Sequence, residues 1–237
     1  MTLAPSRGVR ALELALFVAS LLVVGLVVLA LVWSGKGPYE DIMNGSPVRG
    51  GCLIMIGVND RDMCVPLARL VELHQGWASY VTGSEAEPPR FSDVRFTVDE
   101  YSHMSDVRGV FGTAKLLVAA GLFVILVRLQ RARVRGPRAM WRLVRDGSLI
   151  AAGVVVCIGV VAVFAFEPLF LLFHYLFFPQ GNFLFDPATS NIVRLYPDWY
   201  WEGITLRVGL SFVVAALALA AISALRLARP SAIDSPR

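Results

Sequence analysis

The order of hydrophobic and polar residues divides the chain into four long apolar runs separated by polar segments. About 20 helical residues cross the hydrocarbon core of a bilayer, and each run is long enough to do so. The expected transmembrane helices are residues 11–33, 110–127, 149–173 and 204–225. No small-residue cleavage pattern follows the first run, so we interpret it as a retained helix. The pattern predicts an all-α integral membrane protein with four transmembrane helices.

Positive charge predicts how these helices are oriented. The segment Arg128–Asp146 holds seven arginines and one acidic residue, and both tails carry further arginines. The positive-inside rule assigns such segments to the cytoplasm. The expected cytoplasmic parts are residues 1–10, 128–148 and 226–237, and the extracytoplasmic parts are residues 34–109 and 174–203. The net charge of +4 then reflects membrane topology, so we expect no nucleic-acid partner.

The segment 34–109 is too long for a simple connection, and we expect it to be mostly helical. Apolar residues at helical spacing predict an amphipathic helix over 65–81. Thr97 with Glu100 three residues later forms a capping box, which predicts a helix that begins near Val98 and leads into the second run. Cys52 and Cys64 form a disulfide in an oxidising exterior or remain free thiols, and their spacing does not decide between the two.

The three histidines of the chain, His74, His103 and His174, all lie on the expected outer side. His174 ends the third run, with phenylalanines one helical turn before and after it. Partial burial there favours a neutral ring that accepts a proton. The alternative is an anchoring histidine at the membrane interface. His74, on the amphipathic helix, is expected on a solvated face.

Charged residues near the histidines have two interpretations each. Asp106 follows His103 by three residues, so its carboxylate is placed to orient the ring. The alternative is a surface ion pair involving Arg108. Glu167, expected to be buried inside the third run, either caps a polar pocket or forms a structural ion pair with Lys115 or Arg207. No zinc, nucleotide or hydrolase motif is present, and the histidines do not have the spacing of known metal ligands, so we expect no metal.

Two motifs carry a family resemblance. The stretch "EYSHMSDVRGVF" precedes the second run, and "FHYLFFPQGNFLFDPATSNIVRLYP" follows the third. Together, in this order, they resemble the lipoprotein intramolecular transacylases (Lit) of bacteria. The arrangement of four spans with a large first outer segment is similar to that family as well.

The resemblance implies a membrane acyltransferase. Its substrate is a lipoprotein with a diacylglyceryl group on its N-terminal cysteine. One acyl chain moves to the α-amino group of that cysteine, which gives the lyso-form lipoprotein without any cofactor. The enzyme is expected in the bacterial cell membrane, in contact with membrane lipid, with its active site on the extracytoplasmic side.

The resemblance also implies the site. The family's two catalytic histidines correspond to His103 and His174. We expect Asp106 and Arg108 to support them, and Asn182 or a backbone amide near Gly181 to donate to the oxyanion. The expected acyl groove is lined by Phe170, Phe177, Phe178 and Phe183, and the alternative for these rings is packing against membrane lipid. The alternatives are a non-enzymatic membrane protein whose outer segment binds a partner, and an enzyme that acts on another lipid ester.

Overall fold

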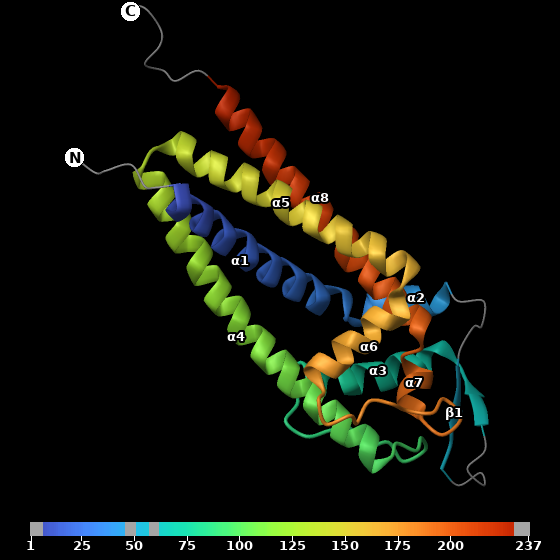
Figure 1. Cartoon of the computed structure of the whole chain (residues 1–237). Coiled ribbons are helices and arrows are strands. Elements are labelled where there is room, and N and C mark those ends of the chain that lie inside the picture. The colour runs from blue at the N-terminus through green and yellow to red at the C-terminus, as the bar shows by residue number, and fades with distance from the viewer. Residues whose placement is uncertain (1–6, 46–50, 57–61, 230–237) are drawn as a thin grey trace, which may run out of the picture. The chain divides into compact units, whose positions relative to one another are not determined.

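The computed structural model describes residues 7–45, 51–56 and 62–229 (Figure 1). Residues 1–6 and 230–237 of the two tails, including Arg237, lie outside the described residues. In chain order the elements are α1 (Arg7–Trp33), α2 (Lys36–Asn44), β1 (Gly51–Ile54), β2 (Asp62–Val65), α3 (Leu67–Val81), α4 (Val98–Val134), α5 (Pro137–Phe164), α6 (Phe166–Phe177), α7 (Asn191–Leu195) and α8 (Asp198–Ala228).

Four of the helices, α1, α4, α5 and α8, are long and apolar enough to cross a membrane. Large apolar side chains point outward from them: on α4, Leu116, Phe123 and Leu126 are each at least 65% exposed. Such a surface is costly in water and is the expected one in contact with lipid. The predicted all-α class with four membrane-length helices is therefore confirmed.

The chain divides into two compact units. The first comprises Met1–Leu29, Leu116–Val160 and Val208–Arg237. Its core joins α1, α5 and α8 through six buried apolar side chains, Val18, Ala151, Ala152, Val155, Phe212 and Ala216. Small residues bring these helices together, because a Cβ on Gly25 would lie 2.5 Å from the Phe212 ring. The expected basic loop 128–148 is mostly helical, and α4 and α5 are separated only by a turn at Gly136, whose φ of +128° favours glycine.

The third apolar run differs from the expected single helix. Residues 149–173 are divided between α5 and α6, which are separated at Ala165 (φ −145°, ψ 46°). Pro168 explains the break, because it has no N–H to continue an interior helix, whereas a helix tolerates it in the first turn. The 12 residues of α6 are too few to span a bilayer. His174 therefore lies on a separate short helix.

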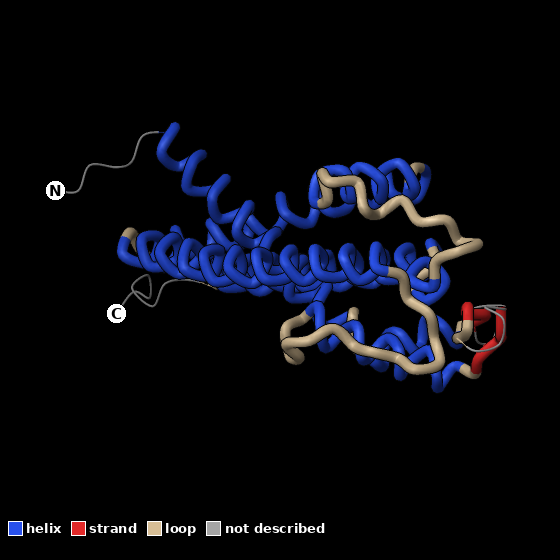
Figure 2. The backbone as a smooth tube through the Cα atoms, turned by 90° about the horizontal axis from the view of Figure 1, so that it is seen from below, coloured by secondary structure: helices blue, strands red, loops and turns tan. Residues whose placement is uncertain are grey.

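The second unit comprises Ala30–Lys115 and Val161–Arg207. Its α2 and α3 fall in the expected helical outer segment, but an antiparallel hairpin of β1 and β2 is also present (Figure 2). Cys52 pairs with Cys64 across this hairpin, and the two form a disulfide, which decides the question that spacing left open. The buried Asn191 of α7 joins the hairpin by hydrogen bonds with both backbone groups of Ile54. The expectation of a mostly helical outer segment is only partly supported.

Candidate active site

The first turn of α4 positions His103. The predicted capping box is present, because Glu100 Oε2 accepts from the Thr97 N–H (2.6 Å) and Thr97 Oγ1 accepts from the Glu100 N–H (3.2 Å). The other oxygen of the fully buried Glu100 accepts from Ser190 Oγ (2.6 Å) and from the Ile192 N–H (2.8 Å). Sequence analysis missed this second role. One carboxylate thus fixes the start of α4 to α7, one helical turn before His103.

The structure brings His103 and His174 together. His103 comes from α4 and His174 from the last turn of α6, and their ring centroids lie 6.2 Å apart with an interplanar angle of 22°. The side chain of His103 is buried, whereas His174 is partly exposed. Two of the three histidines in the chain, distant in sequence, therefore form a pair.

Phenylalanines surround this pair. Phe170 and Phe183 lie 4.2 and 5.2 Å from the His174 ring, and Phe178 lies 4.8 Å from the His103 ring. Sequence analysis missed Phe173, 5.4 Å from His174, and Phe185, 5.6 Å from His103.

Phe177 is the exception among the four phenylalanines expected to line the groove. It is 50% exposed, and the ring contact described for it is with Phe173 (4.6 Å). Helical spacing put Phe177 and Phe178 together, but α6 ends between them, so the two rings point differently.

The environment keeps both rings neutral. We take the membrane-spanning part of α4 as the apolar run 110–127, so His103 lies outside it. Burial lowers the pKa of His103 to about 4, the adjacent His174 also lowers it, and Asp106 and Asn182 oppose the shift. Burial lowers the pKa of His174 as well, against the hydrogen bond to the Phe170 carbonyl. That carbonyl can only accept, so His174 Nδ1 donates to it (2.8 Å), and Nε2 is left with a free lone pair.

A cluster of three polar side chains, Asp106, Asn182 and Gln180, lies beside His103. Asp106 Oδ2 accepts from Asn182 Nδ2 (2.6 Å) and from Gln180 Nε2 (2.7 Å). Arg108, expected to support the histidines, instead donates to the carbonyls of Tyr80 and Glu85 and lies over the Tyr80 ring. The structure thus brings Asp106 and Asn182 to the histidine pair and holds Arg108 at the end of α3.

The two groups expected to donate to an oxyanion each have a hydrogen-bond partner in the structure. The Asn182 amide nitrogen donates to Asp106, and the backbone N–H of Gly181 donates to the Phe178 carbonyl (3.0 Å). The Gly181 N–H therefore has a partner already, whereas the Asn182 amide carries a second N–H, so its role as an oxyanion donor stays a prediction.

Glu167 does not occupy the buried position expected for it. It is exposed in the first turn of α6, and within the described residues it forms no ion pair. The cations expected to pair with it are engaged elsewhere, since Lys115 donates to the Thr82 carbonyl and Arg207 lies over Trp33. In the part of the chain that the structure describes, no three His, Cys, Asp or Glu side chains form a group able to hold a metal.

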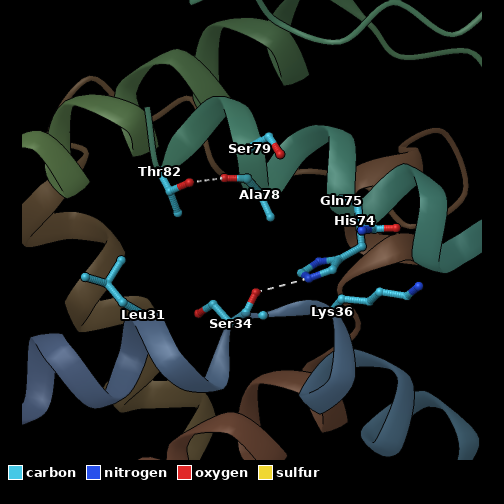
Figure 3. Close-up of a pocket in the computed structure, with 9 residues that line it drawn as sticks. Leu31, Ser34, Lys36, His74, Gln75, Ala78, Ser79 and Thr82 are labelled. Carbon is cyan, nitrogen blue, oxygen red and sulfur yellow. Dashed lines mark hydrogen bonds between the residues drawn. The ribbon is translucent and has the colours of Figure 1, made fainter. Parts of the chain in front are cut away.

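His74, expected on a solvated face, is 2% exposed. It stacks on Tyr39 with the ring centroids 4.1 Å apart, and both nitrogens have partners, Tyr196 Oη (3.2 Å) and the Ser34 carbonyl (3.1 Å). It lines an open pocket of about 260 Å³ between α3 and the segment that joins α1 to α2 (Figure 3). With both nitrogens occupied, His74 has no atom left for proton transfer, and its role is structural.

Comparison with known proteins identifies the relatives of the chain. The family described as lipoprotein intramolecular transacylase Lit matches residues 61–201. The membrane-integral Lit of Bacillus cereus has a similar solved structure, with a TM-score of 0.67 at 13% identity, covering 93% of this chain and 96% of that one. A histidine-to-alanine variant of that enzyme gives 0.62 at 12% identity, covering 92% and 93%, and a histidine-to-arginine variant gives 0.61 at 12%, covering 92% of each chain.

The comparison with curated proteins gives no match. At these identities the likeness to solved structures shows the fold, which is that of a multi-pass membrane protein. The family match covers more than half of the chain. The chain belongs to the lipoprotein intramolecular transacylase (Lit) family.

Proposed function

We propose that His103 and His174 are the catalytic pair of this membrane acyltransferase. The enzyme moves an acyl chain from the diacylglyceryl group of a lipoprotein to the α-amino group of its N-terminal cysteine, and the lyso-form lipoprotein results. One observation carries the assignment of the pair. Two imidazoles from distant parts of the chain lie 6.2 Å apart within a group of phenylalanine rings.

The reaction needs only a proton relay. The amine nitrogen attacks the ester carbonyl, a C–N bond forms, and the C–O bond to the glyceryl oxygen breaks. The proton lost by the amine is finally carried by that glyceryl oxygen, so atoms and charge balance without a cofactor. A neutral imidazole accepts the proton and returns it, as general base and then general acid.

His174 is suited to this role because its Nδ1 proton is held by the Phe170 carbonyl, which leaves Nε2 as the basic atom. His103, whose ring is nearly parallel, supplies the second nitrogen near the reacting carbon. When one ring is protonated, it also becomes a cationic donor toward the oxyanion.

The aromatic rings provide the apolar surface that binds the acyl chain. Phe170, Phe178 and Phe183 present apolar surface next to both histidines, and Phe178 and Phe183 are buried. The substrate's ester lies where acyl chains meet the headgroups. A site lined by apolar side chains, with two polar imidazole nitrogens, suits both parts of such a substrate. Phe177, exposed on α6, is better suited to contact membrane lipid.

The proposal includes the side of the membrane. The arginines at residues 128–145 favour the cytoplasm, which leaves His103 and His174 on the extracytoplasmic side of a bacterial cell membrane. The disulfide between Cys52 and Cys64, in the same unit as the pair, is of the kind that persists in an oxidising exterior.

The test uses a bacterium whose lipoproteins remain diacylated. After expression of the chain, mass spectrometry of a lipoprotein's N-terminal peptide should show the N-acylated lyso form. His103→Ala and His174→Ala should each lower its yield by at least about 100-fold, the usual size of a general acid–base contribution. His74→Gln, which removes the third histidine, should retain the product when expressed at equal level.

Two results would contradict the proposal. Unchanged lipoproteins with well-expressed protein would reject the reaction, and an acyl chain found on another lipid or on water would point to a different lipid ester. Retained product in either histidine variant would reject the catalytic pair.

A further inference from the structure

We propose that Asn182 is a positioning residue that holds His103 in the tautomer with its proton on Nδ1, so that Nε2 is the basic atom. This inference rests on the proposed catalytic role of His103. It gives the oxygen of Asn182 a role as hydrogen-bond acceptor for the histidine, while the nitrogen donates to Asp106.

Asp106 decides which way the Asn182 amide points. An ionised carboxylate only accepts hydrogen bonds, so the group 2.6 Å from Asp106 Oδ2 is the amide nitrogen of Asn182. The reverse orientation would put two oxygens in contact. Asn182 Oδ1 is consequently directed away from Asp106 and remains available as an acceptor.

The complementary donor belongs to His103. Within the described residues, His103 Nδ1 and Asn182 Oδ1 are both buried and neither has a hydrogen-bond partner. Asn182 nevertheless lies close enough to His103 to raise the pKa of the imidazole ring. An unpaired buried polar atom costs about 1–3 kcal/mol, and a bond from Nδ1–H to Oδ1 removes that cost for both atoms at once.

The same arrangement then holds in both rings. The Phe170 carbonyl keeps a proton on His174 Nδ1, and Asn182 keeps one on His103 Nδ1, so each ring presents an unprotonated Nε2. When His103 becomes an imidazolium, Asp106 stabilises it through the polarised amide of Asn182. This is how outer groups in other sites fix the orientation and basicity of a histidine.

The experiment compares Asn182→Ala with Gln180→Ala. Both variants remove one donor to Asp106 Oδ2, but Gln180 has no described contact with His103. The chain carrying ¹⁵N-labelled histidine is purified in detergent, and nitrogen NMR reports the tautomer of each of the three rings. His103→Ala assigns the signal.

Wild-type protein and Gln180→Ala should both carry the His103 proton on Nδ1. Asn182→Ala should shift it toward Nε2 or a mixture, and should lower the rate of lyso-form production by about 10- to 100-fold. Should Asn182→Ala unfold, Asn182→Ser, with its shorter side chain, is measured in the same way.

An Asn182 variant that keeps the proton on Nδ1 would overturn the inference, whatever its rate, because a purely structural role leaves the tautomer unchanged. Failure of the proposed function has a separate signature. In that case the wild-type chain makes no lyso form, while the tautomer still reports on Asn182.

Discussion

Replacement of Glu100 by glutamine tests whether one buried carboxylate holds the site together. Glu100 is fully buried and accepts three hydrogen bonds, from the Thr97 N–H, from Ser190 Oγ and from the Ile192 N–H. A glutamine has nearly the same shape, but one of its two terminal atoms is a donor. If its oxygen faces Ser190 and Ile192, its nitrogen faces the Thr97 N–H, and two donors then point at each other.

The expected destabilisation follows from the number of hydrogen bonds that the substitution removes or weakens. One hydrogen bond to a charged group is lost, which costs about 1.5–3 kcal/mol, and the two remaining bonds lose their charge-assisted part. We expect Glu100→Gln to destabilise the protein by about 2–4 kcal/mol. Because Glu100 also fixes the turn before His103, the yield of lyso form should fall as well.

Thermal unfolding in detergent measures the change, and Asp99→Asn is the matched control. Asp99 is the adjacent acidic residue of the same first turn, but it is exposed, so its removal costs only about 0.3–1 kcal/mol through the helix dipole. Equal melting temperatures for Glu100→Gln and Asp99→Asn would refute the assignment of Glu100 as the connection between α4 and α7.

Three further predictions concern other parts of the second unit. The folded pKa of His74 is about 4 against 6.5 when unfolded, so the unfolded state binds more protons between these values. The stability that His74 contributes should be full above pH 6.5 and fall by about 3 kcal/mol towards pH 4, in addition to the loss from His103, whose pKa is lowered in the same way. Melting curves of His74→Gln should therefore show a smaller pH dependence than those of the wild type. Reduction of the Cys52–Cys64 disulfide, which closes a 12-residue separation, should cost about 3 kcal/mol, measured as a lower melting temperature with reductant and no such shift in Cys52→Ser/Cys64→Ser. Phe178→Ala, at a 2% exposed ring beside His103, should cost about 3–5 kcal/mol and reduce lyso-form yield; an unchanged melting temperature would show that this ring is not part of the packed site.

Signals that act over a few residues predicted much of the fold. The apolar runs indicated four membrane-length helices, because length and hydropathy alone decide whether a helix crosses lipid. The capping box of Thr97 and Glu100 predicted the start of α4 at Val98, because both of its hydrogen bonds form within one turn. Pro168 explains the break of the third run at Ala165, but a proline by itself does not distinguish a kink from a complete break.

Burial and hydrogen-bond partners were less predictable. His74 occupies a helix with polar neighbours in sequence, yet Tyr39 and Tyr196 from other segments cover it. Arg108 follows Asp106 closely along α4, yet it points to carbonyls at the end of α3. In each case the partner comes from a distant part of the chain, which helical spacing does not report.

The sequence by itself determined the class of the protein and its membrane-length helices, and its two motifs indicated the family and predicted the pair of catalytic histidines. Only the tertiary structure decided that those histidines meet, that Asn182 donates to Asp106 beside them, and that Phe177 is exposed. The physical reason is the distance along the chain over which each interaction acts. Periodicity and capping depend on neighbours within a few residues, whereas the environment of His103 depends on α6 and the loop after it, more than 70 positions along the chain.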